Sequence, residues 1–281
     1  MNRRAFVTAV AAAPAFAQTA PVTRQGKLKQ CVTRGVFARS MPFEETCREA
    51  ARLGCKGYDL EGPDNWATLK KYGLIPTMYP PGPGGTIADA LNRKENHDRL
   101  EKAMHAALDE AASNGVPSII TFSGNRRGMS DDEGADNCVA FLNRVKSHAE
   151  DHGVNICMEL LNSKINHKDY MCDHTAWGAA VMKRVNSPRV KLLYDIYHLQ
   201  IMEGDIARTI RENIQWIGHF HTGGNPGRHE IDGTQELNYH FIAQTIADLG
   251  FTGYVAHEYS PAQGRDAIQS LNQAMEIFDV T

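Results

Sequence analysis

The sequence predicts an α/β fold, a single closed (β/α)8 (TIM) barrel, on three observations. Short apolar, β-branched segments alternate with longer amphipathic segments, which is typical of a parallel sheet with crossover helices. Eight such pairs follow one another, and no glycine-rich dinucleotide-binding fingerprint is present, which favours a closed barrel over an open doubly wound sheet. The length of 281 residues fits one such domain, since these barrels reach about 250 residues.

The elements follow from local pattern and from capping residues. Pro42 suits a first helical turn, Asn238 is a good N-cap, and Gly250 supplies a helix stop. The segment 79–85, rich in proline and glycine, is interpreted as a lid on the catalytic rim. The predicted strands are residues 31–37, 57–60, 74–78, 118–122, 154–158, 190–194, 215–220 and 253–256. The predicted helices are residues 42–53, 64–72, 95–114, 131–152, 175–185, 203–213, 238–249 and 265–278.

The first 17 residues have the pattern of a cleavable signal peptide. Residues 1–4 are positively charged, residues 5–13 are apolar, and Ala15 and Ala17 form a small-x-small cleavage signal. The arginine pair resembles the core of a twin-arginine signal, which predicts a bacterial periplasmic or secreted protein; a general secretion signal is the alternative. The expected division of the chain is residues 1–17 signal peptide, 18–29 linker and 30–281 barrel domain.

Composition restricts the partners. A formal net charge of −3 provides no basic field for nucleic acid, and no apolar segment reaches the roughly 20 residues needed to span a bilayer. We therefore expect a small-molecule substrate, no nucleic acid and no membrane insertion after signal cleavage, and the sequence leaves a homo-oligomer open. Six cysteines without any CxxC pair are too sparse for a disulfide framework, although one or two disulfides after export stay open.

The feature closest to a chemistry is a set of four residues at or just past strand ends. Glu159, Asp195, His221 and Glu258 follow the last four predicted strands in order. A single carboxylate after a strand is usually a helix N-cap or a solvated loop residue. Four in register at the rim of a barrel instead predict a site for a hard or borderline divalent cation, because carboxylates at a barrel mouth are costly unless paired or metal-bound.

Three further residues are predicted to contact the substrate. His219 lies two positions before His221, so both side chains point the same way on a strand, and His219 is either a substrate contact or a hydrogen-bonded interior residue. His198 follows Asp195 by three residues, about one helical turn. Arg228 belongs to the loop after the seventh strand, where barrels often bind anionic groups, although a lone loop arginine is often simply exposed.

Five motifs resemble the hydroxypyruvate isomerase branch of the xylose-isomerase-like barrel superfamily, which also contains ketose 3-epimerases. They are residues 158–162 (MELLN), 193–200 (LYDIYHLQ), 217–221 (IGHFH), 226–230 (PGRHE) and 256–259 (AHEY). The resemblance implies one Mn(II) or Mg(II) ion bound by Glu159, Asp195, His221 and Glu258, with the two glutamates as acid and base. Histidine at position 221 matches the epimerases, whereas bacterial hydroxypyruvate isomerases often have glutamine there.

This ligand set predicts an isomerase or epimerase that transfers a proton through a metal-stabilised enediolate of a small carbohydrate or hydroxy-keto acid. The same enediolate could lose a β-oxygen, so a sugar lyase or dehydratase stays open. A non-catalytic periplasmic sugar-binding protein is a further alternative. An abasic-site-type endonuclease is disfavoured, because those enzymes use histidines on early strands and the early strands here end in Leu60, Met78 and Phe122.

Overall fold

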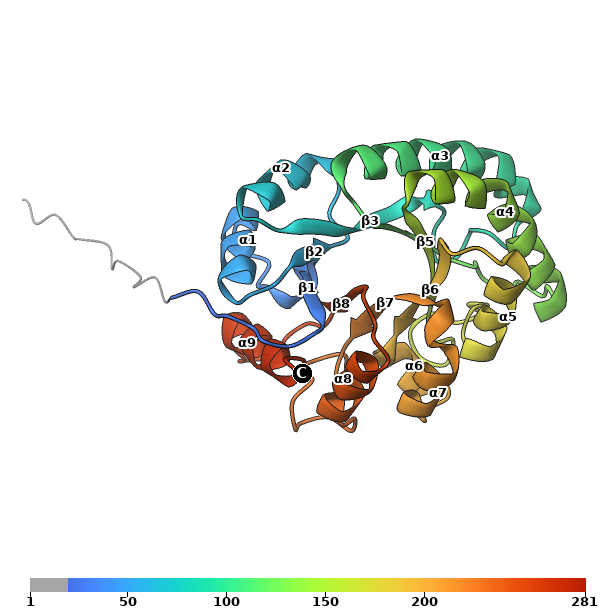
Figure 1. Cartoon of the computed structure of the whole chain (residues 1–281). Coiled ribbons are helices and arrows are strands. Elements are labelled where there is room, and N and C mark those ends of the chain that lie inside the picture. Colours follow the sequence, from blue (N-terminus) through green and yellow to red (C-terminus); the bar gives the residue numbers. More distant parts are fainter. Residues whose placement is uncertain (1–19) are drawn as a thin grey trace, which may run out of the picture.

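A computed structural model describes residues 20–281 and contains a closed barrel of eight parallel strands in sequence order (Figure 1). The first and last strands pair with each other, with Cys31 opposite Ala256, and this pairing closes the barrel. The predicted (β/α)8 barrel is confirmed. The predicted signal peptide, residues 1–17, lies outside the described residues.

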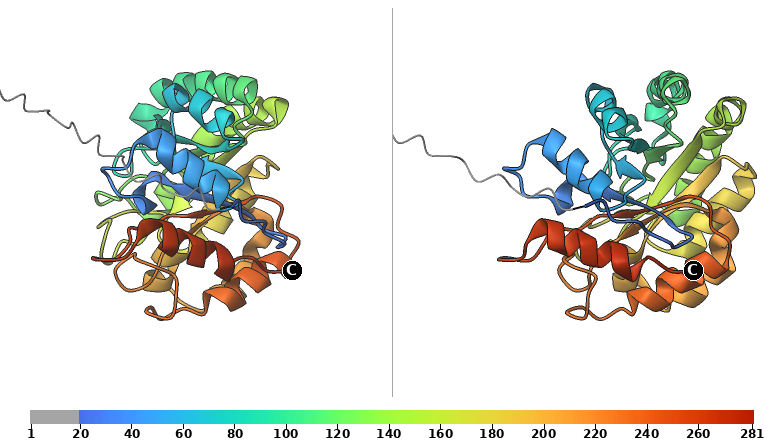
Figure 2. Two further views of the ribbon diagram at one scale, coloured as in Figure 1. Left: turned by 90° about the vertical axis from the view of Figure 1, so that its left-hand side faces the viewer. Right: turned by 60° about the vertical axis from the view of Figure 1, so that its left-hand side comes forward.

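The helices surround the barrel and cover its outer face (Figures 1 and 2). The strands are β1 (Lys29–Thr33), β2 (Gly57–Asp59), β3 (Ile75–Gly84), β4 (Ser118–Thr121), β5 (Asn155–Leu160), β6 (Val190–Asp195), β7 (Ile217–Thr222) and β8 (Tyr254–His257). The helices are α1 (Phe43–Arg52), α2 (Pro63–Lys71), α3 (His97–Asn114), α4 (Asp131–His152), α5 (Thr175–Val185), α6 (Ile196–Met202), α7 (Ile206–Asn213), α8 (Tyr239–Asp248) and α9 (Ala267–Ile277). Short 3-10 turns are η1 (Arg34–Val36), η2 (Lys94–Asn96) and η3 (Ile214–Trp216).

Each outer helix packs one apolar stripe against the strands. In α3, Leu100, Met104 and Leu108 are fully buried at helical spacing, and removing this surface from water supplies most of the packing free energy. Helix α4 begins where Ser130 Oγ accepts a hydrogen bond from Glu133 N, and it ends at Gly153 in the left-handed conformation. Capping and burial thus fix the helices, and with them the strand ends that form the rim.

Three predicted boundaries were wrong in ways that matter for the rim. Strands β5 and β7 each run two residues past their predicted apolar runs, to Leu160 and Thr222, and all four added residues are buried. Glu159 and His221 therefore lie inside strands. The expected lid, residues 79–85, is largely the end of β3, which pairs with β4 from Tyr79 to Gly84 across an irregularity in register.

Helix α6 was not predicted. The expected elements pass from a strand at residues 190–194 to a helix at residues 203–213 with no helix between them. Five of its seven residues are buried, so the segment lacks the alternation of apolar and polar residues that marks a surface helix. The side chain of Asp195 starts this helix by accepting a hydrogen bond from His198 N.

Residues 20–28, the described part of the expected linker, lie along the end of the barrel opposite the rim. Val22 N donates to Arg52 O, and Lys27 N donates to Val280 O. All six cysteines lie within residues 20–281, and each is buried and unpaired. Among the described helices, none combines the length and the apolar character that crossing a membrane requires.

Candidate active site

The four residues expected to bind a metal come together at the carboxyl ends of neighbouring strands. Glu159 projects from β5, Asp195 ends β6, His221 lies in β7, and Glu258 follows β8. One ligand atom from each side chain lies within 4.8 Å of the others. Parallel strands in sequence order deliver these ends to one rim, so local sequence and barrel topology together build the cluster.

His221 stands between carboxylates on both sides of its ring. Its Nε2 lies 2.9 Å from Oδ2 of Asp59, and its Nδ1 lies 2.6 Å from Oε2 of Glu258 and 3.4 Å from Oε1 of Glu159. The geometry at Nδ1 does not satisfy a hydrogen bond, and this buried atom has no other partner. A ring with an anionic oxygen at each nitrogen needs either a second proton or a cation at Nδ1.

The electrostatics of the cluster fit a divalent cation. Burial raises the pKa of Glu159 to about 7, and burial together with the charge of Glu258 raises the pKa of Asp195. Burial opposes the charge on Glu258 too, but Arg228 and His221 outweigh it and hold the pKa of Glu258 at about 2. The positive groups of the protein therefore do not neutralise all three carboxylates, and a dication would.

Arg228 reaches the cluster from the loop after β7. Its Nη2 lies 2.5 Å from Oδ2 of Asp195 and 2.8 Å from Oε2 of Glu258, and its guanidinium lies over the ring of Tyr197, 5.2 Å from the ring centroid. Arg228 adopts a positive φ of 56°, in the left-handed region that side chains other than glycine rarely adopt. The residue expected to contact substrate thus also pairs with two of the carboxylates.

His198 presents one nitrogen to the cluster. The backbone N–H of Asn162 donates to Nδ1 of His198 at 3.2 Å, which leaves the ring proton on Nε2. That Nε2 is buried without a hydrogen-bond partner and lies 3.8 Å from Oδ2 of Asp195. Burial and the charge of Arg228 lower the pKa of His198 well below its usual value, so the ring is neutral and offers one N–H donor.

His219 lies one layer below the rim, apart from the other expected residues. It is fully buried, and its Nε2 lies 2.9 Å from Oδ2 of Asp59, the same oxygen that faces His221. The sequence left two roles open for His219, a substrate contact or a hydrogen-bonded interior residue. The burial of His219 and its contact with Asp59 fit the interior residue.

Asp59 and Thr77 were missed by sequence reasoning. The end of β2 was assigned to Leu60, whereas the strand ends at Asp59, which is fully buried beneath the four-residue cluster and accepts a hydrogen bond from Thr77 Oγ1. The imidazoles of His219 and His221 outweigh burial and lower the pKa of Asp59. The sequence does carry one signal for this site, because Asp59 is an acidic residue at the end of the short strand Gly57–Asp59.

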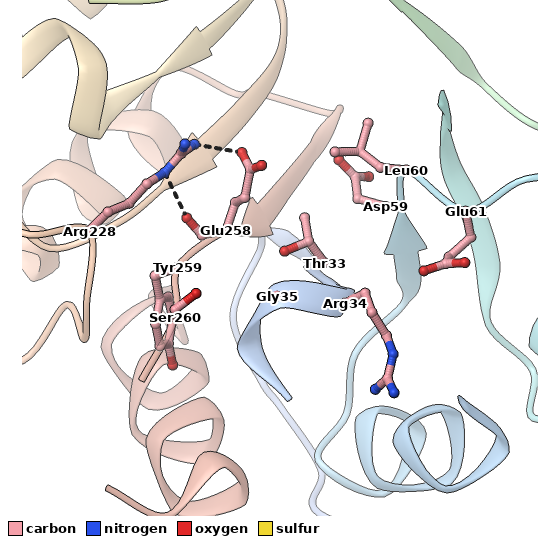
Figure 3. A pocket seen from close by; sticks show the side chains of 10 residues that line it. All are labelled: Thr33, Arg34, Gly35, Asp59, Leu60, Glu61, Arg228, Glu258, Tyr259 and Ser260. Atoms are coloured by element: carbon pink, nitrogen blue, oxygen red, sulfur yellow. Dashed lines mark hydrogen bonds and ion pairs between the residues drawn. The ribbon is translucent and has the colours of Figure 1, made fainter. Parts of the chain in front are cut away.

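An open pocket of about 290 Å³ adjoins the cluster on the side of the first two strands (Figure 3). Arg228 and Glu258 form one wall, and the residues after β1 and β2 form the opposite wall. Its lining is Thr33, Arg34, Gly35, Asp59, Leu60, Glu61, Arg228, Glu258, Tyr259 and Ser260. The pocket is small, and five of its ten lining residues carry a carboxylate or a guanidinium group.

A closed parallel barrel with an acidic centre at its carboxyl rim defines a class of barrel proteins whose activity lies at the strand ends. This chain belongs to the xylose isomerase-like TIM barrel family, whose model matches residues 47–278. The membership expected from the five motifs is confirmed.

Two curated relatives match the chain over part of its length. The chain is 38% identical over 106 residues to a 2-oxo-tetronate isomerase of Cupriavidus necator, a match covering 37% of this chain and 40% of the relative. It is 34% identical over 106 residues to a hydroxypyruvate isomerase of Escherichia coli, covering 37% and 41%. Each match thus spans about two fifths of the relative's length.

Two solved structures resemble the whole barrel. An AP endonuclease, family 2, from Brucella melitensis superimposes with a TM-score of 0.77 at 25% identity, covering 87% of this chain and 96% of that one. A 3-keto-D-glucoside 4-epimerase from E. coli gives 0.75 at 21% identity, covering 90% and 99%. At 21% identity, the similarity to the epimerase structure shows a shared fold.

Proposed function

We propose that the protein is a metal-dependent isomerase or epimerase that moves a proton on a small carbohydrate or hydroxy-keto acid. The observation that carries this proposal is that the carboxylates of Glu159 and Glu258 both lie within 3.4 Å of Nδ1 of His221, next to a small pocket. Two carboxylates facing one bound substrate can remove a proton and return one. The similarity to the two curated isomerases supports the same class of reaction.

A single divalent cation, Mn(II) or Mg(II), would be held by Glu159, Asp195, His221 and Glu258. Three carboxylates and one imidazole are ligands that suit these hard to borderline ions. When bound, the ion would supply Lewis acidity to the substrate oxygens and so acidify the neighbouring C–H bond.

The chain's own residues would then orient the substrate and transfer the proton. The N–H at Nε2 of His198 has no partner in the protein and can donate to a substrate oxygen. Arg228 lies in the same wall of the pocket as Glu258 and keeps Glu258 ionised, which suits Glu258 as the base. Glu159, whose carboxyl is buried, is placed to return a proton on the adjacent carbon or on the other face of the same carbon.

Product analysis in deuterated water tests this function. The purified protein is loaded with Mn(II), incubated with a panel of free sugars, keto-sugars, glycosides and hydroxypyruvate, and followed by NMR. We expect one product that is an isomer of its substrate and carries deuterium from solvent at the carbon that exchanged. An isomer without solvent deuterium would indicate hydride transfer and would contradict the roles of the glutamates. Loss of water would indicate a dehydratase instead.

Glu159→Gln and Glu258→Gln test the two carboxylates separately. Each should lower kcat by about 10²-fold to 10⁴-fold, the usual contribution of an acid or base. Glu95→Gln, an exposed glutamate of η2, is the matched control and should leave kcat unchanged. Bound Mn(II) is counted for every variant, because loss of the metal alone would also abolish activity and must be separated from loss of proton transfer.

The likeness to an AP endonuclease raises the alternative of phosphodiester cleavage. Strands β2, β3 and β4 carry no histidine, whereas early-strand histidines are the additional ligands expected of that class. The net charge of −3 also provides little attraction for DNA. Incubation with DNA containing an abasic site is therefore expected to give no cleavage, and cleavage would overturn the isomerase proposal.

A further inference from the structure

A second group of metal-ligating side chains lies on the outer ring of helices, away from the carboxyl rim. Asp109 and His105 come from α3, and His148 and His152 come from α4. The two helices run side by side in Figure 1. In this barrel each helix leads from the carboxyl end of one strand back to the start of the next, so residues near the ends of α3 and α4 lie opposite the rim.

Two imidazole nitrogens lie close to one carboxylate oxygen. Nε2 of His148 lies 2.7 Å and Nε2 of His152 lies 3.1 Å from Oδ1 of Asp109. His148 and His152 are four residues apart on one helix, and their rings stack with centroids 4.3 Å apart and an interplanar angle of 22°. Three potential ligands from two helices therefore converge on one point at the surface.

The tautomer of His152 indicates that a proton or a cation belongs between this ring and Asp109. Its Nδ1 lies 2.9 Å from the backbone carbonyl of His148, and a carbonyl can only accept, so Nδ1 carries a proton. A neutral His152 then has a bare lone pair at Nε2, only 3.1 Å from Oδ1 of Asp109. A lone pair and an anionic oxygen this close repel each other unless a proton or a cation lies near both. Donation from the second ring nitrogen to a backbone carbonyl is also how metal-binding histidines are commonly oriented.

His105 adds a second observation. Its ring stacks on His148, with centroids 4.5 Å apart, and its Nε2 is buried without any hydrogen-bond partner. A third imidazole with an unpartnered nitrogen is thus packed directly against the cluster. It also restricts the orientation of His148, because that ring lies between His105 and His152.

We propose that Asp109, His148 and His152 form a binding site for a transition-metal dication, of which Zn²⁺ is the representative. Imidazole nitrogens with one carboxylate are ligands that suit zinc, nickel and copper rather than magnesium or calcium. Side-chain movements of less than about 1 Å would bring the three donors to the separation of about 3.4 Å that neighbouring ligands have around a tetrahedral ion with bonds of 2.0–2.1 Å. Water would complete the coordination.

The position of the cluster in the helices favours a cation. His152 is the last residue of α4, where the unpaired carbonyl groups of the helix end carry partial negative charge. A bound ion would connect α3 to α4 and so restrain two neighbouring helices of the outer ring. The inference is independent of the proposed function, since the two sites share no residue.

Metal counting on the full-length protein tests this site. The wild type and the double variant His148→Ala/His152→Ala are equilibrated with Zn²⁺ by dialysis, and the zinc per chain is measured. We expect the double variant to bind one ion fewer than the wild type, whatever number the rim binds. His240→Ala, an exposed histidine of α8 outside the cluster, is the matched control and should keep the wild-type number.

Two further measurements keep the result interpretable. Asp109→Asn preserves the shape of the side chain and should weaken zinc binding at this site at least tenfold without altering the fold, which circular dichroism checks. Zinc should raise the midpoint of thermal unfolding more in the wild type than in Asp109→Asn. Equal zinc content in the wild type and the double variant would overturn the proposal and would leave a protonated His152 paired with Asp109 as the description of this cluster.

Discussion

Oδ2 of Asp59 accepts a hydrogen bond from Nε2 of His221 at 2.9 Å, and this bond turns Nδ1 of the same ring toward Glu159 and Glu258. Asp59 is fully buried at the end of β2, across the barrel from β7. A buried carboxylate is expensive unless hydrogen bonds satisfy it, and Asp59 also accepts from Thr77, from His219 and from the thiol of Cys31. Asp59 is therefore a positioning residue for the proposed metal ligand.

Asp59→Asn is expected to weaken Mn(II) binding about 10-fold to 100-fold, the usual effect of losing a hydrogen-bond partner of a metal-binding histidine. The amide is a weaker acceptor than the carboxylate and no longer fixes the ring nitrogen that faces the ion. Calorimetric titration with Mn(II) measures the change. Asp64→Asn, an exposed residue of α2, should titrate like the wild type. Unchanged Mn(II) affinity in Asp59→Asn would show that His221 is oriented without this bond.

Arg228→Gln should separate metal binding from turnover. The guanidinium pairs with Asp195 and Glu258, two of the residues that would hold the ion, so its positive charge would compete with the ion. Without it, Mn(II) should bind as tightly as in the wild type or more tightly. In contrast, kcat/KM should fall about 10-fold to 100-fold, because a substrate contact is lost and Glu258 becomes less acidic.

The measurement combines titration of Mn(II) with steady-state kinetics. Arg39→Gln, an exposed arginine in the segment before α1, is the control and should change neither quantity. A fall in Mn(II) affinity in Arg228→Gln would mean that the guanidinium supports the cluster rather than competing for it.

The rim ligands could be predicted because each lies at the end of an apolar run, and the carboxyl ends of strands in a parallel barrel meet at one rim. Glu159 and His221 were predicted at or just past the ends of their strands, since the apolar runs stop at Met158 and Phe220. The structure continues both strands, as their polar side chains face the barrel mouth and are buried.

The buried residues beneath the rim could not be predicted from the sequence in the same way. Asp59 and His221 are 162 positions apart, and their contact depends on the stagger of strands on opposite sides of the barrel, which no local pattern encodes. Helix α6 could not be predicted for a related reason. Its surroundings bury it on most sides, so the periodicity that marks a surface helix is missing.

Asp173→Asn should lower the free energy of unfolding at neutral pH by about 2 kcal/mol, since hydrogen bonds to a charged group contribute about 1.5–3 kcal/mol. Asp173 is almost fully buried and accepts from Nη1 and Nη2 of Arg126 at 3.2 and 3.1 Å and from Ser163 Oγ at 2.6 Å. Burial alone would raise the pKa of Asp173, but these bonds outweigh it and lower the pKa.

The sign of the pH dependence follows from that depressed pKa. The carboxylate of Asp173 contributes its full stabilisation above the pKa of about 3.9 that it has in the unfolded chain, and the contribution is lost as the pH falls through the lower folded-state value. Urea unfolding at pH 7 and at pH 3 should thus show a difference between wild type and Asp173→Asn that shrinks at low pH. Asp98→Asn, whose side chain is 96% exposed, should differ little from the wild type at either pH. A gap that widens on acidification would contradict the assignment.

Gly57→Ala should destabilise the barrel and also weaken the proposed metal site, because Gly57 lies where β2 and β3 approach each other. A Cβ added there would lie 2.3 Å from Cγ2 of Thr77 and 2.6 Å from the carbonyl oxygen of Ile75, and the backbone atom cannot move aside alone. Overpacking of this kind costs about 1–3 kcal/mol, which corresponds to roughly 2–12 °C in Tm for a protein of this size.

Displacing Thr77 would also disturb its hydrogen bond to Asp59, so Mn(II) affinity should fall together with Tm. Gly233→Ala is the matched control, since an added Cβ there meets nothing within 4 Å and the residue is exposed. Calorimetric unfolding and Mn(II) titration of both variants give the comparison. If Gly57→Ala lowered Tm without changing Mn(II) affinity, the path from Thr77 through Asp59 to His221 would not control the orientation of the ring.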